Sequence, residues 1–224
     1  VSDTEIVVQK AQRGTADAVL TCKDALAGFD GSLLVLSGDC PLITPDTIRE
    51  LADMRARSNA AVVVLTMELD DPFGYGRIIR DGEGRVERIV EQKDANAAEA
   101  AVTECNSGFY CFDAQALFEA LEQVGSDNAQ GEFYLTDVLE ICRGAGRDVL
   151  ALPASDVSEC LGVNSRVQLA AATCALQSRI NKEHMAAGVT MWDPASVWIG
   201  PDVEIAPDVE LLPQTFLLGK TQVG

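Results

Sequence analysis

The chain has 224 residues, of which 47% are hydrophobic and 23% are charged. It therefore holds enough apolar material for a sizeable core, which excludes wholesale disorder. Its 35 acidic and 17 basic residues give a formal net charge of -18, and a field of that sign repels nucleic acid and anionic membranes. We expect neither as a partner, and an anionic substrate would need a metal ion or a local basic cluster.

Both ends of the chain are abrupt. It begins at Val1 without a methionine, a signal peptide or a hydrophobic anchor, and it stops at Gly224 within a repeating pattern described below. We expect it to be a piece of a longer protein with a cytoplasmic location.

The cysteines and the histidine exclude several kinds of site. The seven cysteines form no C-x-x-C pair and stand mostly in apolar runs, which predicts reduced, buried thiols of a cytosolic protein. The clustered spacing of a zinc site is missing. His184 is the single histidine and lies in a polar, helix-compatible stretch, which argues against a Ser-His-Asp triad or an H-E-x-x-H metalloprotease.

Strand and helix signals alternate from residue 1 to about 165. The apolar run 33–36 predicts a buried parallel strand. Thr44 can cap a helix that begins at Pro45, because proline suits the first turn. Further elements are expected at 61–65 (strand), 77–80 and 85–90 (hairpin), about 107–112 (strand), 114–124 (helix), 136–143 (helix) and 149–152 (strand). This alternation predicts a three-layer α/β fold with a mostly parallel sheet.

The last sixty residues change character twice. Residues 166–187 lack Gly and Pro and are rich in Ala, Leu and Gln, which predicts one amphipathic linker helix. Beyond it, aliphatic or branched residues recur every six positions. One series is Ile199, Ile205, Leu211, Leu217 and Val223, and a second, offset by four, is Val203, Val209, Thr215 and Thr221.

A six-residue repeat of this kind is typical of a parallel β-helix, which uses about three hexapeptides per coil. A strand run with accidental spacing is the alternative, and the length of the matched series argues against it. Only about one and a half coils are present, fewer than the roughly three stacked units that repeat stability requires.

Several polar motifs follow predicted strands or precede predicted helices. Asp39 follows Ser37-Gly38 after the first strand, where α/β folds bind ligands and where an aspartate can hold Mg²⁺ beside a phosphate. Gln9 precedes Gly14-Thr15 at a helix start, whose N–H groups could meet an anion or a base edge. Each motif also has a sufficient local explanation as a turn or cap.

The remaining candidates stand near the other strands. Gly76 allows close backbone approach to a ligand, the Glu91 carboxylate could accept hydrogen bonds from sugar hydroxyls, and Asn106 is a turn former or a sugar ligand. Thr136 precedes a helix and Asn164 precedes another, so capping explains both.

The order of these motifs closely resembles that of sugar nucleotidyltransferases. The motifs are Gln-x4-Gly-Thr-Ala, Ser-Gly-Asp-x-Pro-Leu, Asp-Pro-x-Gly-Tyr-Gly-Arg-Ile, Ile-Val-Glu-x-Lys-Asp-Ala, Asn-Ser-Gly, Gln-Gly-Glu-x-Tyr-Leu-Thr-Asp and Gly-Val-Asn-x-Arg. Within that group, the chain is similar to the bifunctional N-acetylglucosamine-1-phosphate uridylyltransferase/glucosamine-1-phosphate acetyltransferases. The most specific segments are 71–78, 130–137 and 188–194.

The resemblance implies three regions. Residues 1–165 would be a Rossmann-like uridylyltransferase domain, 166–188 a linker helix, and 189–224 the start of a left-handed β-helix acyltransferase domain. The implied reaction is Mg²⁺-dependent uridylyl transfer from UTP to N-acetylglucosamine 1-phosphate, releasing pyrophosphate. The product, UDP-N-acetylglucosamine, would serve bacterial envelope polymers such as peptidoglycan and lipopolysaccharide.

The resemblance also implies roles for the candidate residues. Asp39 and Asn164 would be the catalytic metal ligands. The uracil-binding positions would be Gln9, Gly14 and Thr15. The remaining substrate-binding positions would be Gly38 and, around the acetamido sugar, Gly76, Glu91, Asn106 and Thr136.

The family's basic glycine-rich loop, which wraps the triphosphate, has no match here. We therefore expect several dozen residues to precede Val1, and this chain alone to be poorly active. The acetyl-CoA site would lie past Gly224, and the full-length protein would be a homotrimer. Two alternatives stay open: another sugar-1-phosphate nucleotidyltransferase with a β-helix tail, thymidylyl- or adenylyl-transferring, and a non-catalytic fragment.

Overall fold

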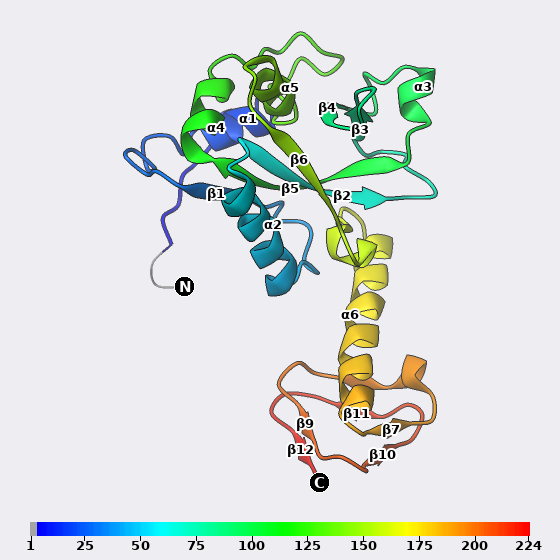
Figure 1. Ribbon diagram of the computed structural model, residues 1–224. Helices are drawn as coiled ribbons and strands as arrows, with labels where there is room; N and C mark the ends of the chain where they lie inside the picture. The colour runs from blue at the N-terminus through cyan, green and yellow to red at the C-terminus, as the bar shows by residue number, and fades with distance from the viewer. Residues whose placement is uncertain (1–3) are drawn as a thin grey trace. The chain divides into compact units, whose positions relative to one another are not determined.

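The computed structural model describes residues 4–224. They fall into two compact units, one built from residues up to 38 and 43–160, the other from 39–42 and 161–224. Residues 1–3, where the first predicted domain begins, lie outside the described part. Figure 1 labels the elements of both units.

The first unit is built on a sheet. Its strands are β1 (Ser32–Val35), β2 (Val62–Glu68), β3 (Arg77–Arg80), β4 (Val86–Val90), β5 (Glu104–Asp113) and β6 (Val149–Pro153). The order is β4-β3-β5-β2-β6, and β1 also pairs with β5. The ten-residue β5 is long enough to hold β2 along one edge and both β1 and β3 along the other.

The sheet is mixed, so the prediction of a mostly parallel sheet is wrong. Within this sheet, β5 is antiparallel to β1, β2 and β3, the β3–β4 hairpin is antiparallel, and the described strands β2 and β6 pair in parallel. The reason lies in the connection between the β3–β4 hairpin and β5. No long crossover helix precedes β5, so β5 enters the sheet between β1 and β2 in the direction opposite to both. β1 is also half-buried rather than buried.

Helices cover both faces of this sheet, which makes three layers (Figure 1). The helices are α1 (Thr15–Leu20), α2 (Pro45–Ser58), α3 (Ala97–Ala100), α4 (Ala114–Leu121), α5 (Asp137–Gly144) and the 3-10 turn η1 (Val157–Cys160). α2 lies on one face, and α1, α4 and α5 lie on the other. α2 begins as predicted, because the Thr44 side chain accepts a hydrogen bond from the backbone N–H of Thr47 and Pro45 occupies the first turn.

The core of this unit forms from strands and helices whose apolar side chains are shielded on every side. Its members include Val62, Val64, Phe112, Leu117, Val138 and Leu139. All six residues are 0% exposed. The predicted apolar runs at 61–65, 107–112, 114–124 and 136–143 therefore supply the core.

β5 carries an irregularity at Gly108. Its φ of 82° lies in the left-handed region, and the register with β2 shifts between Val64 and Thr66, as at a β-bulge. The Ser107 hydroxyl donates to the Leu65 carbonyl at 2.6 Å and accepts from the Phe109 N–H at 3.1 Å. The strand therefore begins at Glu104, earlier than the sequence predicted, because a glycine bulge continues the pairing rather than ending it.

The second unit consists of one long helix and a series of two-residue strands. Its elements are α6 (Arg166–Ala186), β7 (Thr190–Met191), the 3-10 turn η2 (Pro194–Ser196), β8 (Trp198–Ile199), β9 (Glu204–Ile205), β10 (Glu210–Leu211), β11 (Phe216–Leu217) and β12 (Gln222–Val223). The strands pair in parallel as β7–β10, β8–β11 and β9–β12. Trp198 pairs with Phe216 and Glu204 with Gln222, so these partners are three six-residue steps apart.

The predicted helix at 166–187 is confirmed, but its amphipathic character is not. Val167 is 80% exposed, whereas the polar Asn181 is 1% exposed. The Asn181 Nδ2 donates to the carbonyls of Pro194 at 2.8 Å and Val197 at 3.0 Å, and its Oδ1 accepts from Gln177 Nε2 at 2.8 Å. Hydrogen bonds to the following turn thus secure the C-terminal half of α6 where an apolar stripe was expected.

The seven cysteines are free thiols, and five of them are buried, as expected from the apolar runs. Cys22 is half-buried and Cys174 is exposed on α6. Over residues 4–224, no helix combines the length and apolar character needed to cross a membrane.

Replacing Asn181 with leucine should lower the free energy of unfolding of the second unit by about 2–4 kcal/mol, because the buried Val197 carbonyl loses its side-chain donor and the buried Gln177 amide loses its acceptor. Urea denaturation followed by tryptophan fluorescence measures this directly, since both tryptophans, Trp192 and Trp198, belong to this unit. Ser178→Ala, on the exposed side of the same helix, is the control and should change the value by less than about 0.5 kcal/mol. Equal stability of Asn181→Leu and the wild type would contradict the assignment.

Candidate functional site

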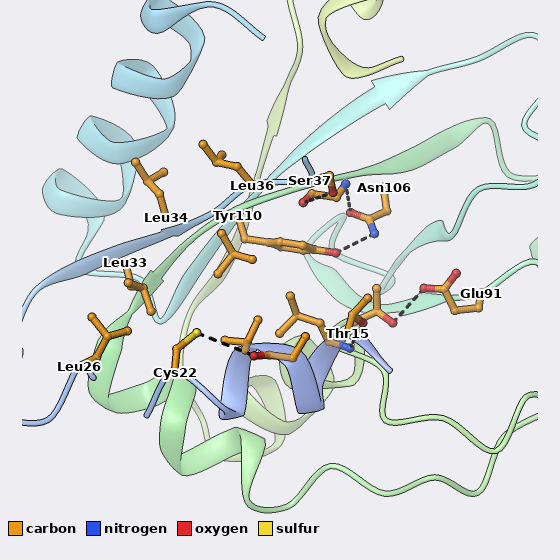
Figure 2. Close-up of a pocket in the computed structure, with 16 residues that line it drawn as sticks. Thr15, Cys22, Leu26, Leu33, Leu34, Leu36, Ser37, Glu91, Asn106 and Tyr110 are labelled. Atoms are coloured by element: carbon orange, nitrogen blue, oxygen red, sulfur yellow. Dashed lines mark hydrogen bonds between the residues drawn. The ribbon is translucent and has the colours of Figure 1, made fainter. Parts of the chain in front are cut away.

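A cavity of about 520 Å³ opens in the first unit between β1, β5 and α1 (Figure 2). Most of its wall is apolar. The apolar side chains are Ala18, Val19, Cys22, Leu26, Leu33, Leu34, Val35, Leu36 and Leu135. The polar side chains are Thr15, Ser37, Glu91, Asn106, Tyr110 and Thr136. A few polar groups on a largely apolar wall are typical of a small-molecule site.

Glu91 and Thr136 meet at the polar end of the cavity. The Thr136 hydroxyl donates to Glu91 Oε1 at 3.1 Å. Gly76 lies beside this carboxylate, since a Cβ there would be 3.5 Å from both Glu91 oxygens and 3.0 Å from Ile89 Cγ2. The sequence placed Gly76, Glu91 and Thr136 in one sugar pocket, and these three residues do lie together.

Asn106 stands next to them, and its amide is held at both ends. Its Oδ1 accepts from the Gly108 N–H at 3.0 Å and its Nδ2 donates to the Tyr110 hydroxyl at 2.7 Å. Its own backbone N–H donates to the Gly76 carbonyl at 2.9 Å. The bulge at Gly108 is therefore also the group that orients the Asn106 side chain.

Hydrogen bonds connect the loop before α1 to the segment before α5. The Phe133 N–H donates to the Arg13 carbonyl at 2.8 Å, the Ala16 N–H to the Phe133 carbonyl at 2.9 Å, and the Leu135 N–H to the Thr15 hydroxyl at 3.0 Å. Gly14 permits this approach, because its φ is 120° and a Cβ there would lie 2.4 Å from the Phe133 carbonyl oxygen. Gly14 thus has a structural role in addition to the predicted one.

Gln9, the other predicted base-binding residue, bonds to this same loop. Its Nε2 donates to the Gly14 carbonyl at 3.2 Å and to Asp17 Oδ2 at 2.7 Å. Thr15 lines the cavity, while Gln9 and Gly14 lie outside its wall. Gly38 follows the wall residue Ser37 directly in the chain and has open space at its Cα.

Asp39 and Asn164, the predicted metal ligands, lie together in the second unit. Asn164 Nδ2 donates to Asp39 Oδ2 at 3.3 Å, and the Val163 N–H donates to the Asp39 carbonyl at 2.9 Å. Gly162 leaves space beside them, since a Cβ there would be 3.4 Å from Asp39 Oδ2 and 3.5 Å from Asn164 Nδ2. The two residues are 125 positions apart, so only folding brings them together.

This pair fits Mg²⁺, because a carboxylate and an amide carbonyl are oxygen ligands of the kind that the ion takes from proteins. The Asn164 amide would turn over to present its oxygen. No three His, Cys, Asp or Glu side chains gather as a metal cluster anywhere in residues 4–224. An ion held here would therefore complete its shell with water or substrate oxygens, as Mg²⁺ usually does beside phosphates.

The polar end of the cavity is acidic. Burial raises the pKa of Glu91, and nearby Asp94 adds to the rise while the Thr136 hydroxyl opposes it. Burial, followed by the charges of Glu140, Glu91 and Asp94, raises the pKa of Asp137 to about 6. Such an end suits neutral hydroxyl and amide groups, and it repels phosphates unless a cation accompanies them.

Tyr110 was missed by the sequence reading, although a signal for it exists. Asn106, Gly108 and Tyr110 are alternate residues of one strand, and alternate residues point to one face of a sheet. The Tyr110 ring stacks on Phe112 with centroids 5.3 Å apart. The apolar wall was also missed, because its residues belong to runs that resemble ordinary core, and Ser37 was noted only as part of the motif that precedes Asp39.

Comparisons with known proteins show the family of this chain. The nucleotidyl transferase family matches residues 2–192. The chain belongs to the nucleotidyl transferase family. The bifunctional protein GlmU of Lactobacillus helveticus is 51% identical over 221 residues, which are 99% of this chain and 48% of that protein. Its counterpart in Corynebacterium efficiens is 51% identical over 197 residues, which are 88% of this chain and 40% of that protein.

This nucleotidyl transferase chain spans about half the length, or less, of the curated relatives it matches. Its fold is similar to a crystal structure described as a glucose-1-phosphate thymidylyltransferase of Bacillus anthracis. That match has a TM-score of 0.56 at 24% identity and covers 75% of this chain and 63% of the other. The family resemblance drawn from the motifs is confirmed, as is the α/β nucleotidyltransferase fold.

Replacing Asp137 with asparagine should raise the free energy of unfolding by about 1–2 kcal/mol at pH 8. The folded pKa of about 6 lies above the ordinary 3.8, so the contribution of this carboxyl is fully present below pH 3.8 and is lost as the pH rises through 6. The variant's advantage should therefore disappear near pH 4. Urea denaturation at both pH values measures it, with the exposed Asp127→Asn as control; a pH-independent difference would rule out this explanation.

Proposed function

We propose that this chain carries the uridylyl-transfer site of a bifunctional enzyme that makes UDP-N-acetylglucosamine from UTP and N-acetylglucosamine 1-phosphate. The observation that carries the proposal is the group formed by Gly76, Glu91, Asn106 and Thr136 at one end of an otherwise apolar cavity. The identity of about 50% to GlmU proteins over nearly the whole chain supports the same choice.

The polar end would bind the acetamido sugar. The Glu91 carboxylate can accept hydrogen bonds from sugar hydroxyls, and its own position is set by the Thr136 hydroxyl. Asn106 uses one amide hydrogen on Tyr110, which leaves the other for a sugar oxygen. These contacts involve uncharged parts of the substrate, which is consistent with the acidity of this end.

The chemistry needs little acid–base help. An oxygen of the sugar phosphate is already anionic; it attacks the α-phosphorus of UTP, the new P–O bond forms, and the bond to the β-phosphate oxygen breaks with its electron pair leaving on pyrophosphate. Catalysis therefore depends on positioning and on neutralising charge.

In this proposal Asp39 and Asn164 hold Mg²⁺, which when bound supplies positive charge to the phosphates. The Asp39 side chain is exposed, as a ligand shared with a substrate must be.

We further propose the domain organisation that the motifs suggested: a uridylyltransferase domain at 1–165, a linker helix at 166–188, and the start of a left-handed β-helix acyltransferase domain at 189–224. The parallel pairing of residues 18 positions apart supports a coil of three hexapeptides. Glucosamine 1-phosphate acetylation with acetyl-CoA, a homotrimer and a cytoplasmic location belong to this proposal for the whole protein.

The direct test is a matrix of UTP, CTP, dTTP and ATP against N-acetylglucosamine 1-phosphate and glucose 1-phosphate, assayed by pyrophosphate release with the complete gene product. The highest kcat/KM should be with UTP and the acetamido sugar. Preference for dTTP or ATP would favour a thymidylyl- or adenylyltransferase. No turnover with any pair would indicate a non-catalytic protein.

Asp39→Ala should reduce Mg²⁺-dependent uridylyl transfer by at least about 100-fold, because the phosphates lose a charge-neutralising ligand set. Acetyl transfer by the same protein should be unchanged. Asp53→Ala, an exposed aspartate on α2, is the matched control and should retain both activities. Parallel loss of uridylyl and acetyl transfer in Asp39→Ala would argue against a metal role.

A further inference from the structure

The side-chain amide of Gln9 has both hydrogens engaged. Its Nε2 donates to the Gly14 carbonyl at 3.2 Å and to Asp17 Oδ2 at 2.7 Å. A primary amide nitrogen carries two hydrogens, so no donor is left on this side chain. What Gln9 can still offer a ligand is the carbonyl oxygen Oε1, at the other end of the planar amide.

The two groups that accept hydrogen bonds from Gln9 have no hydrogen of their own to donate. The Gly14 group is a backbone carbonyl, and the Asp17 carboxylate is kept ionised. Asp17 Oδ1 accepts from Arg13 Nη2 at 2.5 Å, and the bonds from Gln9 and then Arg13 lower the Asp17 pKa, although its burial opposes this. An amide turned over would point its oxygen at two acceptors, so the orientation seen is the one that these neighbours allow.

The surroundings of Asp17 are fixed by contacts on several sides. Asp17 lies on the first turn of α1, and its side chain is 8% exposed, so it is shielded from a ligand. The Arg13 guanidinium stands 5.7 Å from the centroid of the Phe133 ring, and the Ala16 N–H bonds the Phe133 carbonyl. The carboxylate therefore acts on a ligand through Gln9 rather than by touching it.

We propose that Asp17 is a positioning residue that determines base specificity by holding Gln9 as a pure hydrogen-bond acceptor. A pyrimidine with an N–H at ring position 3, such as uracil, offers the matching donor. Cytosine presents an acceptor at that position and meets a second acceptor. The inference rests on the proposed function and on the role that the family resemblance implies for Gln9, which is contact with the base of the nucleotide.

Asp17→Asn is the informative variant because it keeps size and shape. The Arg13 donors draw the oxygen of the new amide, which turns its nitrogen toward Gln9. Gln9 then faces a donor on one side and the Gly14 carbonyl on the other, so it is no longer held as a pure acceptor. In the complete gene product we expect the ratio of kcat/KM for UTP over CTP to fall about tenfold. The change should lie in KM, with kcat at saturating UTP within about twofold of the wild type.

Two further variants separate this role from a general loss of structure. Arg13→Gln removes the ion pair but leaves the carboxylate facing Gln9, so the UTP/CTP ratio should stay within about twofold. Asp17→Glu keeps an acceptor and should restore most of the preference. An unchanged ratio in Asp17→Asn, with wild-type thermal stability, would overturn the inference.

A measurement on the wild-type chain tests the geometry without any variant. The side-chain NH₂ hydrogens of Gln9 should exchange with solvent more slowly than those of the exposed Gln12, measured by NMR. Equal exchange rates would also overturn the inference. If the wild-type protein shows no preference for UTP over CTP while Gln9 is protected, it is the proposed function that fails.

Discussion

Gly108 places a left-handed residue inside the longest strand of the sheet, and the polar end of the cavity depends on it. The bulge keeps Asn106 and Tyr110 on the same edge of the cavity, and the Gly108 N–H holds the Asn106 amide at 3.0 Å. A Cβ at this position would lie 2.6 Å from the Ser37 hydroxyl oxygen, so a side chain here would displace that hydroxyl in addition to straining the left-handed backbone. One residue thus couples the pairing of three strands to the orientation of a binding group.

The charges near the cavity determine which parts of a substrate each group of polar side chains could bind. A chain of net charge -18 gathers Glu91, Asp94, Asp137 and Glu140 near one end of its cavity, where an anion would be repelled. In the proposed function, uncharged sugar groups are recognised there by carboxylate, hydroxyl and amide groups. In the proposed function, the cation that the phosphates need is held by Asp39 and Asn164, which lie together and are both exposed.

Three side-chain amides in this fold are held in one orientation by their hydrogen-bond partners. The Asn106 amide is fixed by a backbone N–H at its oxygen and by the Tyr110 hydroxyl at its nitrogen. The Gln9 amide is fixed by two acceptors at its nitrogen. The Asn181 amide is fixed by two backbone carbonyls at its nitrogen and by the Gln177 amide at its oxygen. A primary amide presents opposite hydrogen-bonding characters at its two ends, so fixing one end determines what the other can bind. In Asn181 this property serves stability, and in Gln9 and Asn106 it serves the proposed recognition.

Local patterns by themselves determined most of the elements. Thr44-Pro45 marked the start of α2, the apolar runs located β2 and β6, and the motif order identified the family. Those features depend on near neighbours in the chain, which a sequence displays directly. Only the tertiary structure decided the direction of β5, the burial of the polar Asn181 on α6, the stacking of Tyr110, and the meeting of Asp39 with Asn164 and of Gln9 with Asp17. Each of these depends on which group comes to face a given side chain after folding, and spacing along the chain does not contain that information.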